Sequence, residues 1–440
     1  MTPKKKTTLS MQDTPLPRLL VGYALTTFCA LFFDALYNIA DTLFVGYGVG
    51  DNAMGGVSVV FPFMLFQGAI AQMIGGGAAS IVSRRLGKSD YEGAGNATAN
   101  AMFLFYTVSA AVSVVGLLFR VPLLRFFGAT EEILPYAKAY FTVILLGNVF
   151  STGFSSIIRA EGKMRYALCI WLVPTAVNVL LDYVFIYVLK LGVTGAALAT
   201  VCCWISSFSM SVFFFRKRSV QAFRAVKLNR KTMAEILTVG VPTLLQMSGI
   251  SVMTLLMNRA LAEHIGTLGV NAFAYMSKII AFALVPFQAL AQAAAPILGF
   301  NFGAKNSRRV GGTLRLTLFY SEIYAALGVV CTVLFAEQMM RIFTGSAQIS
   351  AFGAQGLRIL CGSLPFVPVV LIAGTYFQAI GEKMRAAFSP CVLLVLSAVF
   401  IAILPKRDAG MGVWLSVLLA CVLAAGANAF VWIAYKRRMC

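Results

Sequence analysis

Charge is scarce in this chain, and acidic charge is the scarcest. Only 12% of the 440 residues are charged, 16 of them are Asp or Glu, and there is a single His. Soluble proteins carry about 25% charged residues, whereas 59% of this sequence is hydrophobic. The composition excludes an ordinary soluble domain. It predicts an all-α integral membrane protein, because the apolar runs are too long for the buried strands of a soluble fold.

Enzyme and metal-site patterns are also lacking. The nine Cys are scattered, without metal-ligand spacing, and their odd number gives no disulfide framework. Gly75-Gly76-Gly77 lacks the following Lys-Ser or Lys-Thr of a phosphate-binding loop, and close helix packing explains it better. We therefore expect no enzyme activity and no cofactor. Any coupling energy must come from an ion gradient or from the gradient of the substrate.

The formal charge of +20 could suggest nucleic-acid binding, but its distribution argues against this. Lys and Arg gather in alternate loops and at both ends of the chain, as the positive-inside rule predicts for membrane proteins. The basic side would then face anionic lipid head groups. We predict membrane lipids as partners, no nucleic acid, and both termini in the cytoplasm.

Twelve apolar runs are long enough to be transmembrane helices. They are expected at residues 19–45, 53–77, 94–119, 133–158, 167–189, 193–215, 234–261, 269–296, 311–336, 351–380, 386–404 and 411–435. A basic linker at 216–233 separates an N-terminal six-helix bundle (19–215) from a C-terminal one (234–435). Residues 1–18 and 436–440 are expected to be cytoplasmic tails.

The two halves of the chain resemble each other. A shift of 216 positions aligns them, and the shift grows slightly later in the chain. It pairs Thr27 with Thr243, Gly50 with Gly266, Gln72 with Gln288, Gly87 with Gly303, Gly162 with Gly381 and Gly195 with Gly412. Six crossings per half make the repeats parallel, related by a pseudo-twofold axis along the membrane normal. Paired bundles suit alternating access. A channel is an alternative, but the sequence has no ring of repeated charges.

The first apolar run carries two acids and an amide. Asp34, Asn38 and Asp41 are spaced by four and three residues, so they share one helix face. A charge near mid-bilayer costs at least a few kcal/mol unless it faces a cavity, meets a partner or takes up a proton. The pattern predicts a functional role for Asp41 and makes Asp34 a candidate. A polar stripe that only joins helices is the alternative.

A second polar group falls at a matching depth. Asn178 and Asp182 share a face of the fifth run, and Thr200 follows in the sixth. Counted from the outer helix ends, Asp41, Asp182 and Thr200 lie roughly 7–11 Å below the outer surface. Carboxylates, an amide and a hydroxyl at one depth could coordinate a hard cation such as Na⁺, or could share a proton. A hydrogen-bonded packing cluster is the alternative.

The second half offers a different polar set. Lys278 and Glu322 are ionisable residues within the eighth and ninth runs, and Gln288 is the repeat partner of Gln72. A structural ion pair, with each other or with other groups, is the expected role of Lys278 and Glu322. A substrate or proton site in this half is the alternative.

Several stretches of the sequence form a recognisable combination. They are Tyr37 to Gly46, Ser83 to Lys88, Arg159 to Lys163, Asn178 to Asp182, Gly192 to Ala197, Pro296 to Lys305 and Phe377 to Gly381. Together they resemble the multidrug and toxic compound extrusion (MATE) family of transporters over essentially the whole chain. The likeness is closest to the prokaryotic branch that carries a cation site in the N-terminal half.

The resemblance implies export of cationic amphipathic molecules in exchange for H⁺ or Na⁺, from a prokaryotic plasma membrane, by a protein that we expect to be a monomer. It implies an ion site at Asp41, Asn178, Asp182 and Thr200. A flippase for lipid-linked oligosaccharides or lipids, with a related two-bundle fold, is the second alternative. Its cleft should carry several Arg or Lys to hold pyrophosphate, whereas Lys278 is the one mid-membrane cation found in the sequence.

Two positions depart from the family. The family usually has Pro where this chain has Thr26, while the repeat partner Pro242 is kept. Pro removes a backbone hydrogen bond from a helix, so the bend of the first helix that the family is proposed to use should be weaker here. Asp34 stands where an uncharged residue is usual. It could add a proton site or a contact for a cationic ligand.

Overall fold

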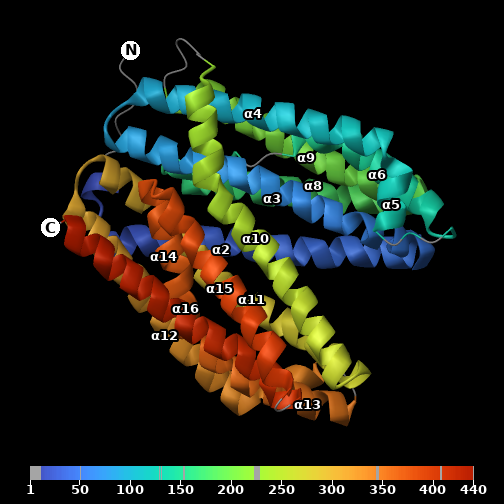
Figure 1. Cartoon of the computed structure of the whole chain (residues 1–440). Coiled ribbons are helices and arrows are strands. Elements are labelled where there is room, and N and C mark those ends of the chain that lie inside the picture. Colours follow the sequence, from blue (N-terminus) through green and yellow to red (C-terminus); the bar gives the residue numbers. More distant parts are fainter. Residues whose placement is uncertain are drawn as a thin grey trace. The chain divides into compact units, whose positions relative to one another are not determined.

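The computed structural model describes residues 11–49, 51–127, 129, 131–151, 154–221, 228–342, 346–406 and 409–439, and none of these residues forms a strand (Figure 1). The helices of the first half are α2 (Leu16–Gly48), α3 (Asp51–Gly87), α4 (Tyr91–Leu118), α5 (Arg120–Phe126), α6 (Leu134–Gly147), α7 (Ser155–Ala160), α8 (Met164–Asp182) and α9 (Gly192–Lys217). Those of the second half are α10 (Arg230–His264), α11 (Thr267–Gly303), α12 (Ser307–Arg341), α13 (Ala347–Leu360), α14 (Val367–Ile380), α15 (Lys383–Ile403) and α16 (Ala409–Met439). Short turns named η1 (Asn148–Phe150), η2 (Tyr183–Val188), η3 (Cys361–Ser363) and η4 (Leu404–Lys406) lie between them.

Within the described ranges, eleven helices are long and apolar enough to cross a membrane. A twelfth span results if a bent helix pair, α13 with η3 and then α14, is counted as one crossing. Residues near the middle of these spans expose large apolar side chains, as in Leu180 and Phe319. The membrane character and the number of helices predicted from composition are therefore confirmed.

The fourth crossing of each half is interrupted. The first half runs from α6 through η1 to α7, and the second runs from α13 through η3 to α14, where the two helices are bent by 47°. Pro368 lies at the start of α14. At this position the N–H that proline lacks would have no hydrogen-bond partner within the helix. Sequence analysis predicted one helix for each of 133–158 and 351–380, because both stretches stay apolar through the break and hydropathy does not register it.

The described residues divide into two compact units. Unit 1 is built mainly from residues 25–240, with 303–305, and unit 2 from residues 15–24, 241–302 and those after 305. One boundary lies inside α2, between Ala24 and Leu25, and the other inside α10, between Gly240 and Val241. The two boundaries are 216 positions apart, which is the shift of the sequence repeat.

The core of unit 1 combines aromatic packing with close backbone approach. The rings of Phe63 and Phe141 meet edge to face with centroids 4.9 Å apart, and Tyr140 and Ile144 are buried beside them. A Cβ on Gly147 would lie 2.2 Å from a methyl group of Val201, so only glycine lets α6 approach α9 this closely. Figure 1 shows α3, α4, α6, α8 and α9 running lengthwise in this unit.

Two glycines fix the crossing of α3 and α10. A Cβ on Gly77 would lie 2.1 Å from the carbonyl oxygen of Ile236, and one on Gly240 would lie 2.0 Å from that of Met73. Both contacts are too short for any side chain, so the backbones touch directly. The helix-packing interpretation of the Gly75-Gly76-Gly77 stretch is confirmed at Gly77.

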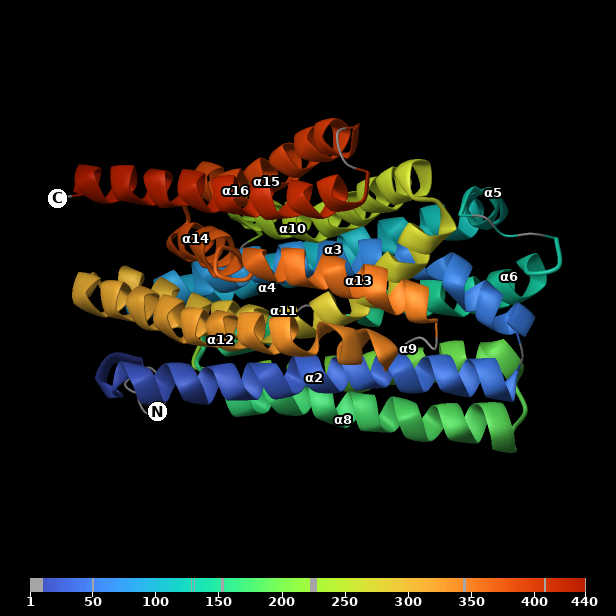
Figure 2. The ribbon, with the colours of Figure 1, turned by 90° about the horizontal axis from the view of Figure 1, so that it is seen from below.

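Unit 2 has its own core, centred on Trp414 of α16. The indole ring is buried and lies 6.2 Å from the ring of Phe273 and 6.0 Å from that of Phe352. The thioether side chains of Met276 and Met340 fill the space around it, as flexible Met side chains often do. Helices α15 and α16 run side by side in this unit (Figure 2).

Candidate functional site

Three of the predicted site residues meet inside unit 1. Asn178 and Asp182 of α8 are fully buried, and Thr200 of α9 is 1% exposed. With its amide nitrogen facing the carboxylate, Asn178 donates to Oδ2 of Asp182 at 2.9 Å, and its oxygen accepts from the backbone N–H of Thr200 at 3.2 Å. The Thr200 hydroxyl donates to the carbonyl of Ala196 at 3.1 Å. The amide therefore bridges the carboxylate of one helix and the backbone of the next.

Helical spacing explains why these groups point inward. Pro174, Asn178 and Asp182 are four residues apart and all buried, so they form one face of α8. Leu180 and Tyr183 are 67% and 56% exposed and lie on other faces. The sequence thus keeps its polar atoms inside the unit and presents apolar side chains outward.

The chain changes helix type directly after Asp182. Residues Tyr183–Val188 form the π-helical turn η2, with a bond from the N–H of Leu189 to the carbonyl of Val184. Single π-helical turns inside α-helices often occur at functional sites. A Cβ on Gly195 would lie 3.0 Å from the Cβ of Phe185, so the start of α9 packs closely on this turn. The turn therefore links the ends of α8 and α9 that hold the polar group.

The remaining N-terminal candidates lie on α2. The backbone of α2 is helical through Asp34, Asn38 and Asp41, but the side chains at 34–43 lie outside the described residues. Beyond them, Val45 is buried in one cluster with Ile186 of η2. The ring centroids of Phe44 and Tyr187 are 6.1 Å apart. The end of α2 thus packs on η2, the turn that follows Asp182.

The polar group of unit 1 has the chemistry of a cation or proton site. Carboxylate, amide and hydroxyl oxygens are ligands that hard cations such as Na⁺ prefer. A carboxylate buried among apolar helices equally favours protonation, because the charged form loses its hydration there. Asp182, Asn178 and Thr200 supply one group of each kind from two adjacent helices. The cation would be a transported ion rather than a resident cofactor.

Lys278 and Glu322 form no ion pair with each other, and neither forms one with another group in the described part of the chain. Lys278 is exposed on α11 and Glu322 is half-buried on α12. The ion pairs among the described residues join other groups, namely Arg84 with Glu235, Arg125 with Glu131, Arg341 with Glu337 and Arg385 with Glu382. Exposure on the outside of the unit removes the need for a partner, because a long Lys side chain can reach a membrane interface. Lys278 and Glu322 therefore do not pair with each other. A pair of either residue with another group stays a prediction, as does a substrate or proton site in this half.

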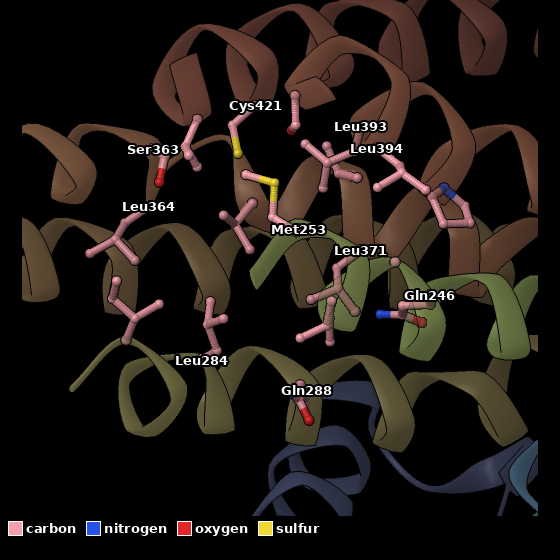
Figure 3. A pocket seen from close by; sticks show the side chains of 18 of the residues that line it. Gln246, Met253, Leu284, Gln288, Ser363, Leu364, Leu371, Leu393, Leu394 and Cys421 are labelled. Carbon is pink, nitrogen blue, oxygen red and sulfur yellow. The ribbon is translucent and has the colours of Figure 1, made fainter. Parts of the chain in front are cut away.

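Unit 2 contains a cavity that sequence analysis did not predict. It has a volume of about 360 Å³ and is lined by residues of α10 to α16. Among them are Gln288, labelled in Figure 3, and the predicted hinge residue Pro242. Pro242 is buried inside α10, whereas its repeat partner Thr26 is half-buried in α2. Arg, Lys, Asp and Glu are absent from the described lining.

Glu161, within the recognised Arg159 to Lys163 stretch, has a role that sequence analysis missed. It is 1% exposed and lies between two spans. Its carboxylate accepts hydrogen bonds from the Ser219 hydroxyl at 2.5 Å, the Val220 N–H at 3.0 Å and the Gln221 amide at 2.6 Å. Burial raises the pKa of Glu161 to about 7, and these hydrogen bonds oppose the rise. The side chain fastens the start of the linker to unit 1.

Comparison with known proteins places the whole chain in one group. The sequence profile of the MatE family matches residues 27–184 and 242–403. The multidrug export protein MepA of Staphylococcus haemolyticus is 21% identical over 403 residues, covering 88% of this chain and 89% of the relative. The probable multidrug resistance protein YpnP of Bacillus subtilis is 23% identical over 399 residues, covering 88% and 89%.

Solved structures show the same architecture. A crystal structure of a MATE protein in the bent conformation superimposes with a TM-score of 0.91 at 25% identity, covering 98% of this chain and 97% of that one. An outward-facing structure, described as a multidrug resistance MATE family transporter of the MOP superfamily, gives a TM-score of 0.88 at 25% identity, with 98% of both chains covered. Two six-helix bundles are therefore the fold of this chain.

Proposed function

Because this chain belongs to the MatE family, we propose that it exports cationic amphipathic small molecules by alternating access, in exchange for H⁺ or Na⁺. The proposal extends the multidrug export named for the MepA relatives to this protein. No enzyme activity is involved, and the energy comes from the ion gradient. We infer a monomer in a prokaryotic plasma membrane, with both termini in the cytoplasm and lipid head groups around the basic side.

The burial of Asp182 carries this proposal. Its side chain is 0% exposed and lies within the span Met164–Val188. An acid in such a place is costly unless it takes up a proton or a cation. The Asn178 amide donates to Oδ2 of this carboxylate, and Thr200, whose N–H donates to the amide oxygen, carries a hydroxyl on the adjacent helix. We assign the coupling ion to this group.

The register of α2 supports adding Asp41 to the group. Thr27, Ala30 and Val45 are buried, and steps of three or four residues carry this helix face from position 30 through positions 34, 38 and 41 to position 45. Val45 belongs to the same buried cluster as Ile186 and Ala196, near the ends of α8 and α9. We propose Asp41 as the second carboxylate, with Asn38 and Asp34 deeper along the same face.

Exchange requires that ion and exported molecule favour different states of the protein. Binding of H⁺ or Na⁺ at Asp41 and Asp182 would favour the state that releases the exported molecule. Thr26 and Pro242 lie close to the unit boundaries in α2 and α10, so we propose that both helices change their bend there during the cycle. The flippase alternative is not favoured, because no Arg or Lys lines the described cavity of unit 2.

The test is Asp182→Asn in proteoliposomes with an imposed gradient and ethidium as the exported molecule. We expect gradient-driven export to fall by at least about a hundredfold, while ethidium equilibration without a gradient changes little. Glu131→Gln is the matched control, because Glu131 is an acid in an exposed ion pair with Arg125; it should transport normally. Undiminished gradient-driven export by Asp182→Asn would refute the assignment.

A second measurement identifies the coupling ion. Wild-type proteoliposomes are given a pH gradient alone or a Na⁺ gradient alone, and ethidium export is followed in each. A Na⁺ site should also raise the melting temperature of the purified protein as Na⁺ is added, because a ligand that binds only the folded state stabilises it. Asp182→Asn and Asp41→Asn should each abolish that rise, and Glu131→Gln should keep it.

A further inference from the structure

The cavity of unit 2 has the size and the surface of a binding site for small molecules. Its volume of about 360 Å³ falls within the range of about 300–1,000 Å³ that ligand pockets occupy. The close view shows Met253, Leu371 and Leu393 around the central space and the amides of Gln246 and Gln288 towards one side (Figure 3). An apolar body with a few polar groups is the usual composition of such pockets.

The sequence repeat relates this cavity to the polar group of unit 1. The shift of 216 positions takes Asp34, Asn38 and Asp41 to Ile250, Thr254 and Met257. Later in the chain the pairing is counted from Gly162 with Gly381 and from Gly195 with Gly412. It takes Asn178 to Ser397, Asp182 to Ile401 and Thr200 to Val417. Of these six counterparts, Ile401 alone is absent from the cavity lining. The cavity thus occupies the repeat-equivalent place of the proposed ion site.

Every carboxylate of that site has an apolar counterpart here. Asp34 is matched by Ile250, Asp41 by Met257 and Asp182 by Ile401, so the cavity cannot hold a bare cation with its lining. An ionic group would lose its hydration without compensation. Met253, Met257 and Cys421 also line the space, and thioethers make favourable contacts with aromatic rings.

The amide groups restrict what fits. Gln246 and Gln288 line the cavity, and the amide of Gln378 donates to the hydroxyl of Thr243 at 2.8 Å nearby. Free amides can pair with a carbonyl, amine or hydroxyl on a ligand. An acyl chain of a lipid has no such group along its length, whereas many compact ring systems do.

We propose that this cavity of unit 2 binds the uncharged, ring-bearing part of the exported molecule. The inference rests on the proposed export function. Acids of the first half hold the ion, and the uncharged cavity of the second half holds the lipophilic rings. The charged group of the ligand does not touch the apolar lining, because it stays outside the cavity or is enclosed by the ligand's own rings. The occupant is a compact aromatic system rather than a lipid chain.

Gly249 provides a way to fill the cavity without disturbing the fold. It lies in α10, lines the cavity, and a Cβ built there meets nothing within 4 Å. Gly249→Leu and the larger Gly249→Phe would therefore place their side chains in free space. Gly426→Leu is the matched control, because Gly426 lies in α16 of the same unit, also meets nothing within 4 Å, and is exposed rather than lining the cavity.

The experiment measures equilibrium binding to the purified full-length protein with radiolabelled tetraphenylphosphonium, a cation surrounded by four phenyl rings. Tetramethylphosphonium, which has the same charge and no rings, is the competitor for comparison. We expect Gly249→Leu to weaken tetraphenylphosphonium binding at least about tenfold and Gly249→Phe to weaken it further, because the buried ring area is lost. The affinity for tetramethylphosphonium should change less than about twofold, and Gly426→Leu should behave as wild type.

The outcomes separate the two proposals. If wild-type protein binds neither cation, the export function itself fails. If wild type binds tetraphenylphosphonium and Gly249→Phe binds it equally well, while both keep the same melting temperature, the cavity is not the ring site. A phospholipid that co-purifies with wild type and is lost from Gly249→Phe, detected by native mass spectrometry, would also overturn the proposal in favour of a lipid chain.

Discussion

The two halves of this chain share a sequence pattern and differ in polarity at one place. In unit 1, α8 and α9 bury Asp182 with Asn178 and Thr200. In unit 2, the repeat-equivalent helices α15 and α16 carry Ser397, Ile401 and Val417 and leave a cavity of about 360 Å³. The two copies of the repeat therefore keep the same helices, but unit 1 buries a carboxylate at this place and unit 2 has an apolar cavity there. The predictions below test how strict that division is.

The largest effect should come from placing a carboxylate in the neutral half. Met257 is 1% exposed and is the repeat counterpart of Asp41. Met257→Asp should lower the stability by about 4 kcal/mol at neutral pH, because it buries a charge without a partner. The loss should shrink as the pH falls, because the folded protein would favour the protonated acid. Thermal unfolding in detergent at several pH values measures this, with Met257→Leu as the control. An equally stable Met257→Asp would show that unit 2 tolerates charge as unit 1 does.

The next effect compares two glycines of α10. A Cβ on Gly240 would meet the carbonyl oxygen of Met73 at 2.0 Å, whereas one on Gly249 meets nothing within 4 Å. Gly240→Leu should destabilise the protein by about 3 kcal/mol or more, because the helices must separate. Gly249→Leu should be neutral or stabilising by up to about 1 kcal/mol, since leucine favours a helix over glycine. Melting temperatures of the two variants in one detergent decide the matter; similar values would mean that the crossing is not tight.

The third prediction concerns pH and the linker. The raised pKa of Glu161, about 7, means that the folded protein binds a proton more tightly than the unfolded chain does. The associated stability is fully present below the usual pKa of a glutamate, 4.5, and is lost as the pH rises through about 7, by about 3 kcal/mol in all. Wild-type protein should therefore melt at a lower temperature at about pH 8 than at about pH 6.

A matched pair isolates that effect. Glu161→Gln removes the titrating group and should flatten this part of the pH profile. Glu382 follows Gly381, the repeat partner of Gly162, but it pairs with Arg385 and its side chain is 39% exposed. Glu382→Gln should leave the slope unchanged. A profile that Glu382→Gln flattens and Glu161→Gln does not would contradict the assignment.

The smallest effect should be that of Ser397→Ala. The Ser397 hydroxyl is buried, lines the cavity and has no hydrogen-bond partner among the described residues. Removing it should change the stability by no more than about 1 kcal/mol, upward, because an unpaired buried hydroxyl is unfavourable. The repeat-equivalent change Asn178→Ala should instead reduce ion-driven ethidium export at least about tenfold. Equal transport losses in both variants would remove the distinction between the halves.

Much of this arrangement follows from local patterns in the sequence. The spans, the tight helix crossing at Gly77 and the meeting of Asn178, Asp182 and Thr200 were predicted, since each depends on periodicity or depth along a helix. The break between α13 and α14, the contact of Glu161 with the linker and the cavity of unit 2 were not, because they depend on packing between distant segments. Lys278 and Glu322 do not pair with each other for the same reason: residues in neighbouring runs need not lie on facing sides of their helices.

The passage of α2 and α10 across the unit boundaries affects how the chain can be divided. A fragment ending in the linker would lack residues 230–240 of unit 1, and the complementary fragment would lack residues 15–24 of unit 2. Neither fragment could complete its own bundle, so a split protein should assemble only when both pieces are made together. An ancestral half-length chain with the same geometry would have been a dimer. In that dimer the beginning of the first helix of each copy would have packed in the bundle of the other copy.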